Sequence, residues 1–397
     1  MHGWTVLADG AAGRHGRTAR PDYTDRMPGP LLRPDAGHDP ARPEYADSVR
    51  AALLGGALGD AIGYRAGADA PSAEHPDPDG GAGRLLVSDD TQLTLYTLDA
   101  LLEVVEWAND GQPADETACL WLAYLRWLRT QGVPHPSEAP RPLPRRLDEH
   151  EVLHAVRDPA GTVLEALRSG RMGEVERPLL PDAEDAAAVL RSAPFGLLPH
   201  VGWRTLAPLA INGAALTHGH PEAQSAAAVY GFTVHAAVRA RREGTARPVA
   251  AAVAAARETA AHLTRPVGET LARLDDAVRA AGAQTPAPGA LPDGRPEDLG
   301  AAPTAPVVLA AGLRAALRAE AEDPAAADPQ AVFRRAVGLG TASGVAPEAT
   351  ASIAGAVTGA ALGTAALPPE WLALLDARDA VADSAERWLR EVGAPGA

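Results

Sequence analysis

The chain has 397 residues, and because it contains no lysine its 36 basic side chains are all arginine. They stand against 51 acidic side chains, which gives a formal net charge of −15. This balance argues against nucleic acid as the main partner, since affinity for that polymer comes from neutralising its phosphates. No apolar run reaches the roughly 18 residues of a membrane span, and the one cysteine, Cys119, excludes an internal disulfide framework. We expect a soluble, cytoplasmic protein that binds neither nucleic acid nor membrane.

The N-terminal stretch is rich in arginine, proline, glycine and aspartate and shows no hydrophobic periodicity. It also lacks the apolar segment of a signal peptide. We therefore predict a disordered tail at residues 1–45, followed by one folded domain at residues 46–397.

The first predicted helix begins at Tyr45, where apolar residues start to recur at helical spacing. A glycine inside a helix costs about 1 kcal/mol relative to alanine. Several in one helix therefore indicate either close packing against another helix or approach of the backbone to a ligand. The glycines are Gly55, Gly56, Gly59 and Gly63.

A loop is predicted at residues 71–83, and further periodic segments follow it. No alternating strand pattern occurs, so the predicted class is all-α, a compact helical bundle. The Pro/Gly-rich stretch 284–306 is interpreted as a surface loop within this single domain. The predicted helices are 90–107, 117–130, 162–168, 206–216, 221–242, 248–262, 268–281, 307–322, 329–338, 349–362 and 381–392.

The best local signal for chemistry is the run Ser88-Asp89-Asp90-Thr91 at the start of the second helix. Adjacent carboxylates flanked by hydroxyls are the hard oxygen donors that Mg²⁺ or Mn²⁺ prefers. The alternative is a helix N-cap, in which one such side chain accepts hydrogen bonds from free backbone N–H groups. Spacing alone leaves both interpretations open.

Three other features are ambiguous when taken singly. His218 and His220 lie between two helices, where a histidine more often caps a helix end than binds a metal. Pro347 and Glu348 suit the first turn of a helix. Asp60 is a lone carboxylate in an apolar helix, where a structural role is the commoner one.

Taken together and in order, these segments resemble the ADP-ribosylglycohydrolase family, which includes dinitrogenase-reductase-activating glycohydrolase. The resemblance runs from about Tyr45 to Val392. It is carried by 51–63 (AALLGGALGDAIG), 86–102 (LVSDDTQLTLYTLDALL), 124–132 (YLRWLRTQG), 166–173 (ALRSGRMG), 191–197 (RSAPFGL), 215–221 (ALTHGHP) and 352–363, with PEWL at 369–372 beyond.

The resemblance implies a compact all-α fold and metal-dependent hydrolysis of the glycosidic bond between ADP-ribose and an acceptor. The implied cofactors are two Mg²⁺ or Mn²⁺ ions, and the implied partner is ADP-ribose or an ADP-ribosylated acceptor. Ser88, Asp89 and Asp90 correspond to the family's first ligand set. Substrate contacts are implied at Asp60, Arg191 and His218.

The second ligand set of the family, Asp-x-Asp followed by Thr or Ser, is not intact. Its positions hold Ala346, Pro347, Glu348 and Ala349, so one carboxylate is a methyl group, the other is lengthened, and the hydroxyl is gone. Glu348 and the next residue, Thr350, are the remaining candidate ligands there. We expect one ion or none rather than two.

Two further departures concern the substrate. The family's glycine-rich loop, whose backbone approaches the ADP-ribose, reads Asp185-Ala186-Ala187-Ala188 here, and the stretch 64–68 lacks the glutamate usual after the Gly-Asp helix. Each added Cβ narrows the approach of a ligand. Two hypotheses remain. The chain is either an ADP-ribosyl hydrolase with impaired or lost activity and an altered centre, or a pseudoenzyme that binds ADP-ribose or a protein partner without turnover.

Overall fold

The computed structural model describes residues 37–68, 83–282, 303–323 and 327–394. Within these ranges the chain forms α-helices and short 3₁₀ turns, with isolated β-bridges and no strand, which confirms the all-α prediction. None of the described helices is both long and apolar enough to cross a membrane.

The long predicted helices are confirmed, with ends that differ by up to three residues. The short helices α6 and α14 were not predicted because four or six residues cannot display a helical period. The helices are α2 Pro43–Ala68, α3 Asp89–Asn109, α4 Glu116–Thr130, α5 Gly161–Arg168, α6 Ala187–Leu190, α7 Trp203–Ala215, α8 Pro221–Arg242, α9 Pro248–Ala260, α10 Gly268–Gly282, α11 Ala305–Glu322, α12 Pro329–Thr341, α13 Pro347–Leu362, α14 Pro369–Leu374 and α15 Arg378–Glu391.

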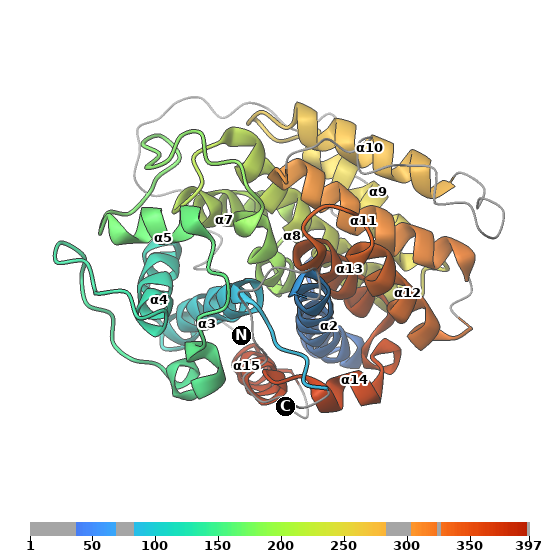
Figure 1. The fold of residues 1–397 in the computed structure, drawn as a ribbon, viewed down its shortest axis with the longest axis horizontal. Helices are drawn as coiled ribbons and strands as arrows, with labels where there is room; N and C mark the ends of the chain where they lie inside the picture. The colour runs from blue at the N-terminus through green and yellow to red at the C-terminus, as the bar shows by residue number, and fades with distance from the viewer. Residues whose placement is uncertain (1–36, 69–82, 283–302, 324–326, 395–397) are drawn as a thin grey trace.

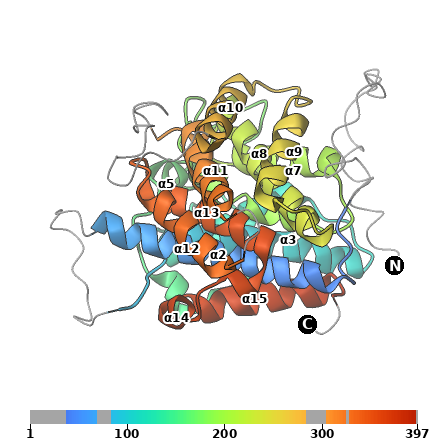
Figure 2. The ribbon, with the colours of Figure 1, turned by 90° about the vertical axis from the view of Figure 1, so that its right-hand side faces the viewer.

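Helices α2 and α13 lie side by side through the middle of the molecule (Figure 1). Their glycines allow the two backbones to touch: a Cβ on Gly59 would lie 2.0 Å from the carbonyl oxygen of Ala351, and one on Gly355 would lie 2.2 Å from that of Gly55. The glycines of the first helix therefore serve helix packing at these positions. Figure 2 shows α15 running alongside α2 on one side of this pair, with α8 and α11 on the other.

The predicted N-terminal tail ends earlier than residue 45. His38 is buried and its ring Nε2 lies 2.9 Å from the carbonyl oxygen of Gly196, while Tyr45 donates a hydrogen bond to the carbonyl oxygen of Leu197. Residues 37–45 thus pack on the domain, because they carry side chains that fill its core. Residues 1–36, the loop at 71–82 and residues 284–302 lie outside the described residues. The predicted loop at 284–306 ends by residue 304, since α11 begins at Ala305.

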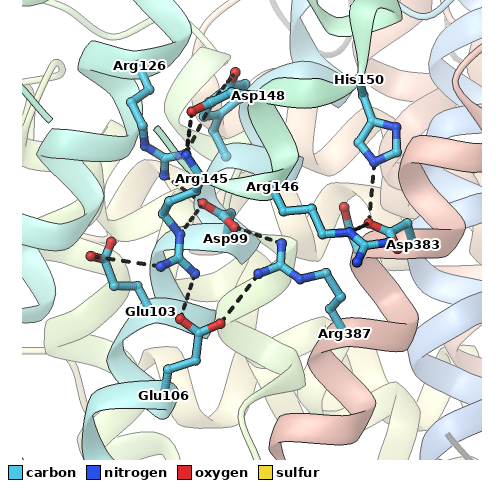
Figure 3. Close-up of polar contacts among 12 residues, drawn as sticks. Asp99, Glu103, Glu106, Arg126, Arg145, Arg146, Asp148, His150, Asp383 and Arg387 are labelled. Carbon is cyan, nitrogen blue, oxygen red and sulfur yellow. Dashed lines mark hydrogen bonds and ion pairs between the residues drawn. The ribbon is translucent and has the colours of Figure 1, made fainter. Parts of the chain in front are cut away.

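A network of ion pairs joins α3, α4, α15 and the 3₁₀ turn Arg146–Glu149 (Figure 3). At its centre the carboxylate of Asp99 is 3% exposed and accepts hydrogen bonds from Arg126 Nη2 at 2.6 Å and Arg145 Nε at 2.9 Å. Arg387 approaches the other oxygen of Asp99 from α15, 3.5 Å away. Asp99 therefore holds three segments that are distant in the sequence against α3.

We expect Asp99→Ala to lower the free energy of unfolding by about 2–3 kcal/mol, because it leaves the buried guanidinium of Arg126 with less compensating charge. Asp383→Ala is the control, since Asp383 pairs with the exposed Arg146 and its loss should cost less than about 1 kcal/mol. Urea unfolding of both variants measures the difference. Equal losses would contradict a central role for Asp99.

Candidate functional site

The site begins at the N-terminus of α3, where Ser88 is the N-cap and its hydroxyl accepts a hydrogen bond from the backbone N–H of Asp90. Asp60 reaches this end from the middle of α2. Its oxygens accept the Ser88 N–H at 2.9 Å, the Ser88 hydroxyl at 2.7 Å and the Thr91 hydroxyl at 2.5 Å. The N-cap interpretation therefore holds for Ser88, which is at the same time the first residue of the acidic motif.

Asp60 points to the start of α3, and the substrate contact that the resemblance implies for it stays a prediction. Its side chain is fully buried, and the hydrogen bonds from Ser88 and Thr91 occupy both of its oxygens. Burial raises its pKa to about 6, against the lowering effect of those hydrogen bonds. Asp60 is therefore a residue that positions the motif, a role that its place in the sequence could not distinguish from substrate contact.

Asp89 and Asp90 are buried, 5% and 8% exposed, although they carry no arginine partner among the described residues. Asp89 Oδ2 accepts the backbone N–H of Ala160 at 3.0 Å. Burial raises the pKa of Asp89 to about 8, and the nearby charges of Asp60 and Asp158 add to the effect. Burial likewise raises the pKa of Asp90 well above its usual range, with repulsion from Asp89 next in importance. The α3 end therefore gathers buried carboxyl groups whose ionised forms are unfavourable by themselves and would be stabilised by a cation.

The segment before the motif is held by two residues that the sequence did not single out. Arg157 donates to the carbonyl oxygen of Val87 at 2.9 Å and pairs with Asp376 Oδ2 at 2.6 Å. The other oxygen of Asp376 accepts the Val87 N–H at 3.1 Å. Both backbone polar groups of Val87 are thus held immediately before Ser88. No local pattern could show this, because Arg157 and Asp376 are far from Val87 in the chain.

The N-terminus of α13 forms the other side of the site. Glu348 is half-buried, burial raises its pKa, and its charge in turn raises the pKa values of Asp60 and Asp90. Ala346 is the N-cap residue with φ of 38°, in the left-handed region, and it offers no capping oxygen. Ala349 is buried and contributes only a methyl group.

Thr350 does not compensate for the missing donors. Its hydroxyl donates to the carbonyl oxygen of Gly340 at 2.7 Å and lies 2.9 Å from the Ser343 hydroxyl. The side chain is fully buried and bonds to the end of α12, so the structure does not bring it to Asp89 and Asp90 as a candidate ligand. The physical reason is that one residue along a helix turns a side chain by about 100°.

The two predicted substrate residues Arg191 and His218 belong to one buried group. Arg191 is 1% exposed, its guanidinium carbon lies 4.7 Å from the ring centre of Tyr124, and its Nη2 donates to the Thr217 hydroxyl at 2.7 Å. His218 is fully buried, and its Nε2 lies 2.9 Å from Asp185 Oδ1. Neither side chain is open to solvent, and the ligand contact that the resemblance implies for them stays a prediction.

Comparison with known proteins decides the family. A model of the ADP-ribosylglycohydrolase family matches residues 41–396. The chain belongs to the ADP-ribosylglycohydrolase family. A solved structure titled "ADP-ribosylglycohydrolase-related protein complex" is similar in fold, with a TM-score of 0.50 and 22% sequence identity over 88% of this chain and 99% of that chain. A search of the curated proteins finds no match.

The two ends of the site differ in the oxygen donors that they offer a cation. The α3 end keeps oxygen donors for a hard cation in Asp89 and Asp90. The α13 end keeps only Glu348, because Ala346 and Ala349 have no side-chain oxygen. In the part of the chain that the structure describes, no three His, Cys, Asp or Glu side chains come together in a group that could hold a metal ion.

Proposed function

We propose that this member of the ADP-ribosylglycohydrolase family binds ADP-ribose or an ADP-ribosylated acceptor, and that its two-ion hydrolysis is impaired or lost. One observation carries the proposal: of the α13 positions that correspond to the family's second ligand set, two carry methyl groups and one carries a lengthened carboxylate, whose charge acts on Asp90 of the α3 motif. The methyl groups are those of Ala346 and Ala349. The helices and their packing are kept, while the side chains that would hold the second ion are replaced.

The loss matters because divalent ions in a hydrolytic centre polarise substrate oxygens and generate the attacking water. A methyl group donates no lone pair, so the α13 end offers at most one oxygen-bearing side chain among the three positions. The chain's own residues still shape the site: Asp60 holds Ser88, and Arg157 and Asp376 hold Val87.

A second candidate is an ADP-ribosyl hydrolase that works with a single ion. It is favoured by Asp89 and Asp90, which remain buried side by side without an arginine partner among the described residues. A chain that had no further use for a cation there would gain stability by replacing them, since an uncompensated buried charge costs several kcal/mol.

Activity assays separate the two candidates. The protein is incubated with ADP-ribosyl-arginine, ADP-ribosyl-serine and O-acetyl-ADP-ribose in Mg²⁺ or Mn²⁺, beside an Asp89→Ala variant. We expect the native chain to release ADP-ribose from these substrates no faster than the Asp89→Ala variant does. Release that disappears in Asp89→Ala establishes the single-ion hydrolase instead. Calorimetry with ADP-ribose tests the binding function, and the absence of heat with and without metal contradicts it.

A further inference from the structure

Four side chains near the site form a chain of hydrogen bonds whose direction is set by chemistry. Arg191 can only donate, so the Thr217 hydroxyl accepts from Nη2 and its own proton points to His218 Nδ1, 2.8 Å away. With Nδ1 accepting, the ring proton of His218 lies on Nε2 and is donated to Asp185 Oδ1 at 2.9 Å. Because the ionised carboxylate of Asp185 can only accept, it fixes the ring proton of His218 on Nε2, and Nδ1 is left to accept from the Thr217 hydroxyl.

The two ends of this chain differ in their access to solvent. Arg191 and His218 are buried, whereas the side chain of Asp185 is 39% exposed. Burial lowers the pKa of His218, against the raising effect of Asp185, so the imidazole is neutral at pH 7. Burial alone would raise the pKa of Asp185, but the hydrogen bonds that it accepts from His218, Thr162 and the Ala187 N–H outweigh burial and hold the pKa below its usual range. Asp185, the solvent-exposed end of this series of hydrogen bonds, therefore carries a negative charge at neutral pH.

Both oxygens of Asp185 are already engaged by the protein. Oδ1 accepts from His218 and from the backbone N–H of Ala187 at 3.1 Å, and Oδ2 accepts the Thr162 hydroxyl at 2.5 Å. These partners come from the turn before α8, from α6 and from α5, so the carboxylate cannot move without breaking bonds to three segments. The charge of Asp185 also raises the pKa of Asp90, so Asp185 is near enough to the acidic motif for the two carboxylates to repel each other.

We propose that Asp185 determines which ligands this site accepts. It accepts the ring N–H of His218, so that this proton is not available to a ligand, and its negative charge disfavours ligands that carry phosphate. The inference rests on the proposed function, since ADP-ribose with its two phosphates is the ligand that such a charge would weaken. Two like charges a few ångströms apart repel by about 1 kcal/mol in water and by more where water is partly excluded.

The test compares the affinity of the native chain, Asp185→Asn and Glu184→Gln for ADP-ribose by calorimetry at low and high salt. Asn keeps the size of the side chain and an oxygen for the His218 proton, while the charge is lost. Glu184 is a neighbouring exposed carboxylate, and its Oε2 lies 3.9 Å from His220 Nε2. We expect Asp185→Asn to bind at least about tenfold more tightly at low salt, with a smaller advantage at high salt because salt screens exposed charges. Glu184→Gln should match the native chain.

The outcomes separate this inference from the proposed function. Suppose that the native chain binds ADP-ribose. If Asp185→Asn binds it equally well, or if its advantage in affinity is the same at both salt concentrations, the inference is overturned and the proposed function stands. If only Asp185→Asn binds, the inference is supported and binding by the native chain is contradicted. If none of the proteins binds, both fail. Asp185→Ser, whose hydroxyl can still accept from His218, replaces Asp185→Asn if that variant does not fold.

Discussion

Gly59→Ala is expected to lower the free energy of unfolding by about 4 kcal/mol, or to prevent folding. The added Cβ would lie 2.0 Å from the carbonyl oxygen of Ala351 and 2.5 Å from its carbonyl carbon. These are backbone atoms inside α13, so no side-chain rotation can relieve the overlap, and the two central helices must separate. Separation would open voids along a close-packed interface, which adds to the usual cost of overpacking of about 1–3 kcal/mol.

The matched control for this variant is Gly338→Ala in α12. Gly338 is also helical, but it is exposed and a Cβ there would meet no atom within 4 Å. Alanine favours a helix over glycine by about 1 kcal/mol, so this variant should be slightly more stable than the native chain. Urea unfolding compares the two. Similar stability changes in both variants would show that α2 and α13 are not in backbone contact.

Asp89→Asn is expected to stabilise the protein by about 2–4 kcal/mol at pH 8 in the absence of divalent cations. Asparagine keeps an oxygen that can accept the Ala160 N–H, but it carries no charge to be buried beside Asp90. The measurement is urea unfolding with a chelator present. Asp182→Asn is the control, because Asp182 is exposed and its change should alter stability by less than about 0.5 kcal/mol.

The pH dependence of this effect has a definite sign. The folded chain holds a proton on Asp89 up to a pKa of about 8, whereas an unfolded aspartate loses it near pH 4. The stability that this group contributes is therefore complete below about pH 4 and is lost as the pH rises toward 8. The advantage of Asp89→Asn should grow between pH 5 and pH 8. An advantage that is constant over this range would contradict the burial of an uncompensated carboxylate.

Melting temperatures measured with and without Mg²⁺ test whether Asp89 and Asp90 bind an ion. A cation held by the native carboxylates would raise the melting temperature of the native chain and not that of Asp89→Asn, because a ligand that binds only the folded state stabilises it. Equal melting temperatures with and without Mg²⁺, for both proteins, would mean that this end of α3 holds no ion. The hydrolase with a single ion would then be excluded.

Much of the helical fold was predictable because its signals are local. The spacing of apolar residues marks α3, α4 and α8, and Pro221 marks the start of α8 to the residue. The motif Ser88-Asp89-Asp90 was likewise recognisable because its residues are consecutive in the sequence. Helices α6 and α14 were missed because they are shorter than two helical turns.

The directions and contacts of single side chains could not be predicted, and the physical reason is the same in each case. Thr350 has an oxygen, but the turn of α13 directs it to Gly340. Arg191 has a charge, but the packing of Tyr124 and Thr217 buries it. Asp185 was noted only as part of the altered loop, and its contact with His218 could not be foreseen because the two residues stand in different motifs. Residue type states what a side chain can do, whereas its direction depends on neighbours elsewhere in the chain.

By itself the sequence determined the helical class, the glycine-rich first helix, the acidic motif and the absence of oxygen donors at Ala346 and Ala349. These properties follow from composition and from spacing within one or two helical turns. Only the tertiary structure decided that Asp60 serves Ser88, that the acidic motif lies buried without an arginine partner among the described residues, and that the bonds from Arg191 end on Asp185. Such contacts join residues that are far apart in the chain, and packing of the whole domain sets them.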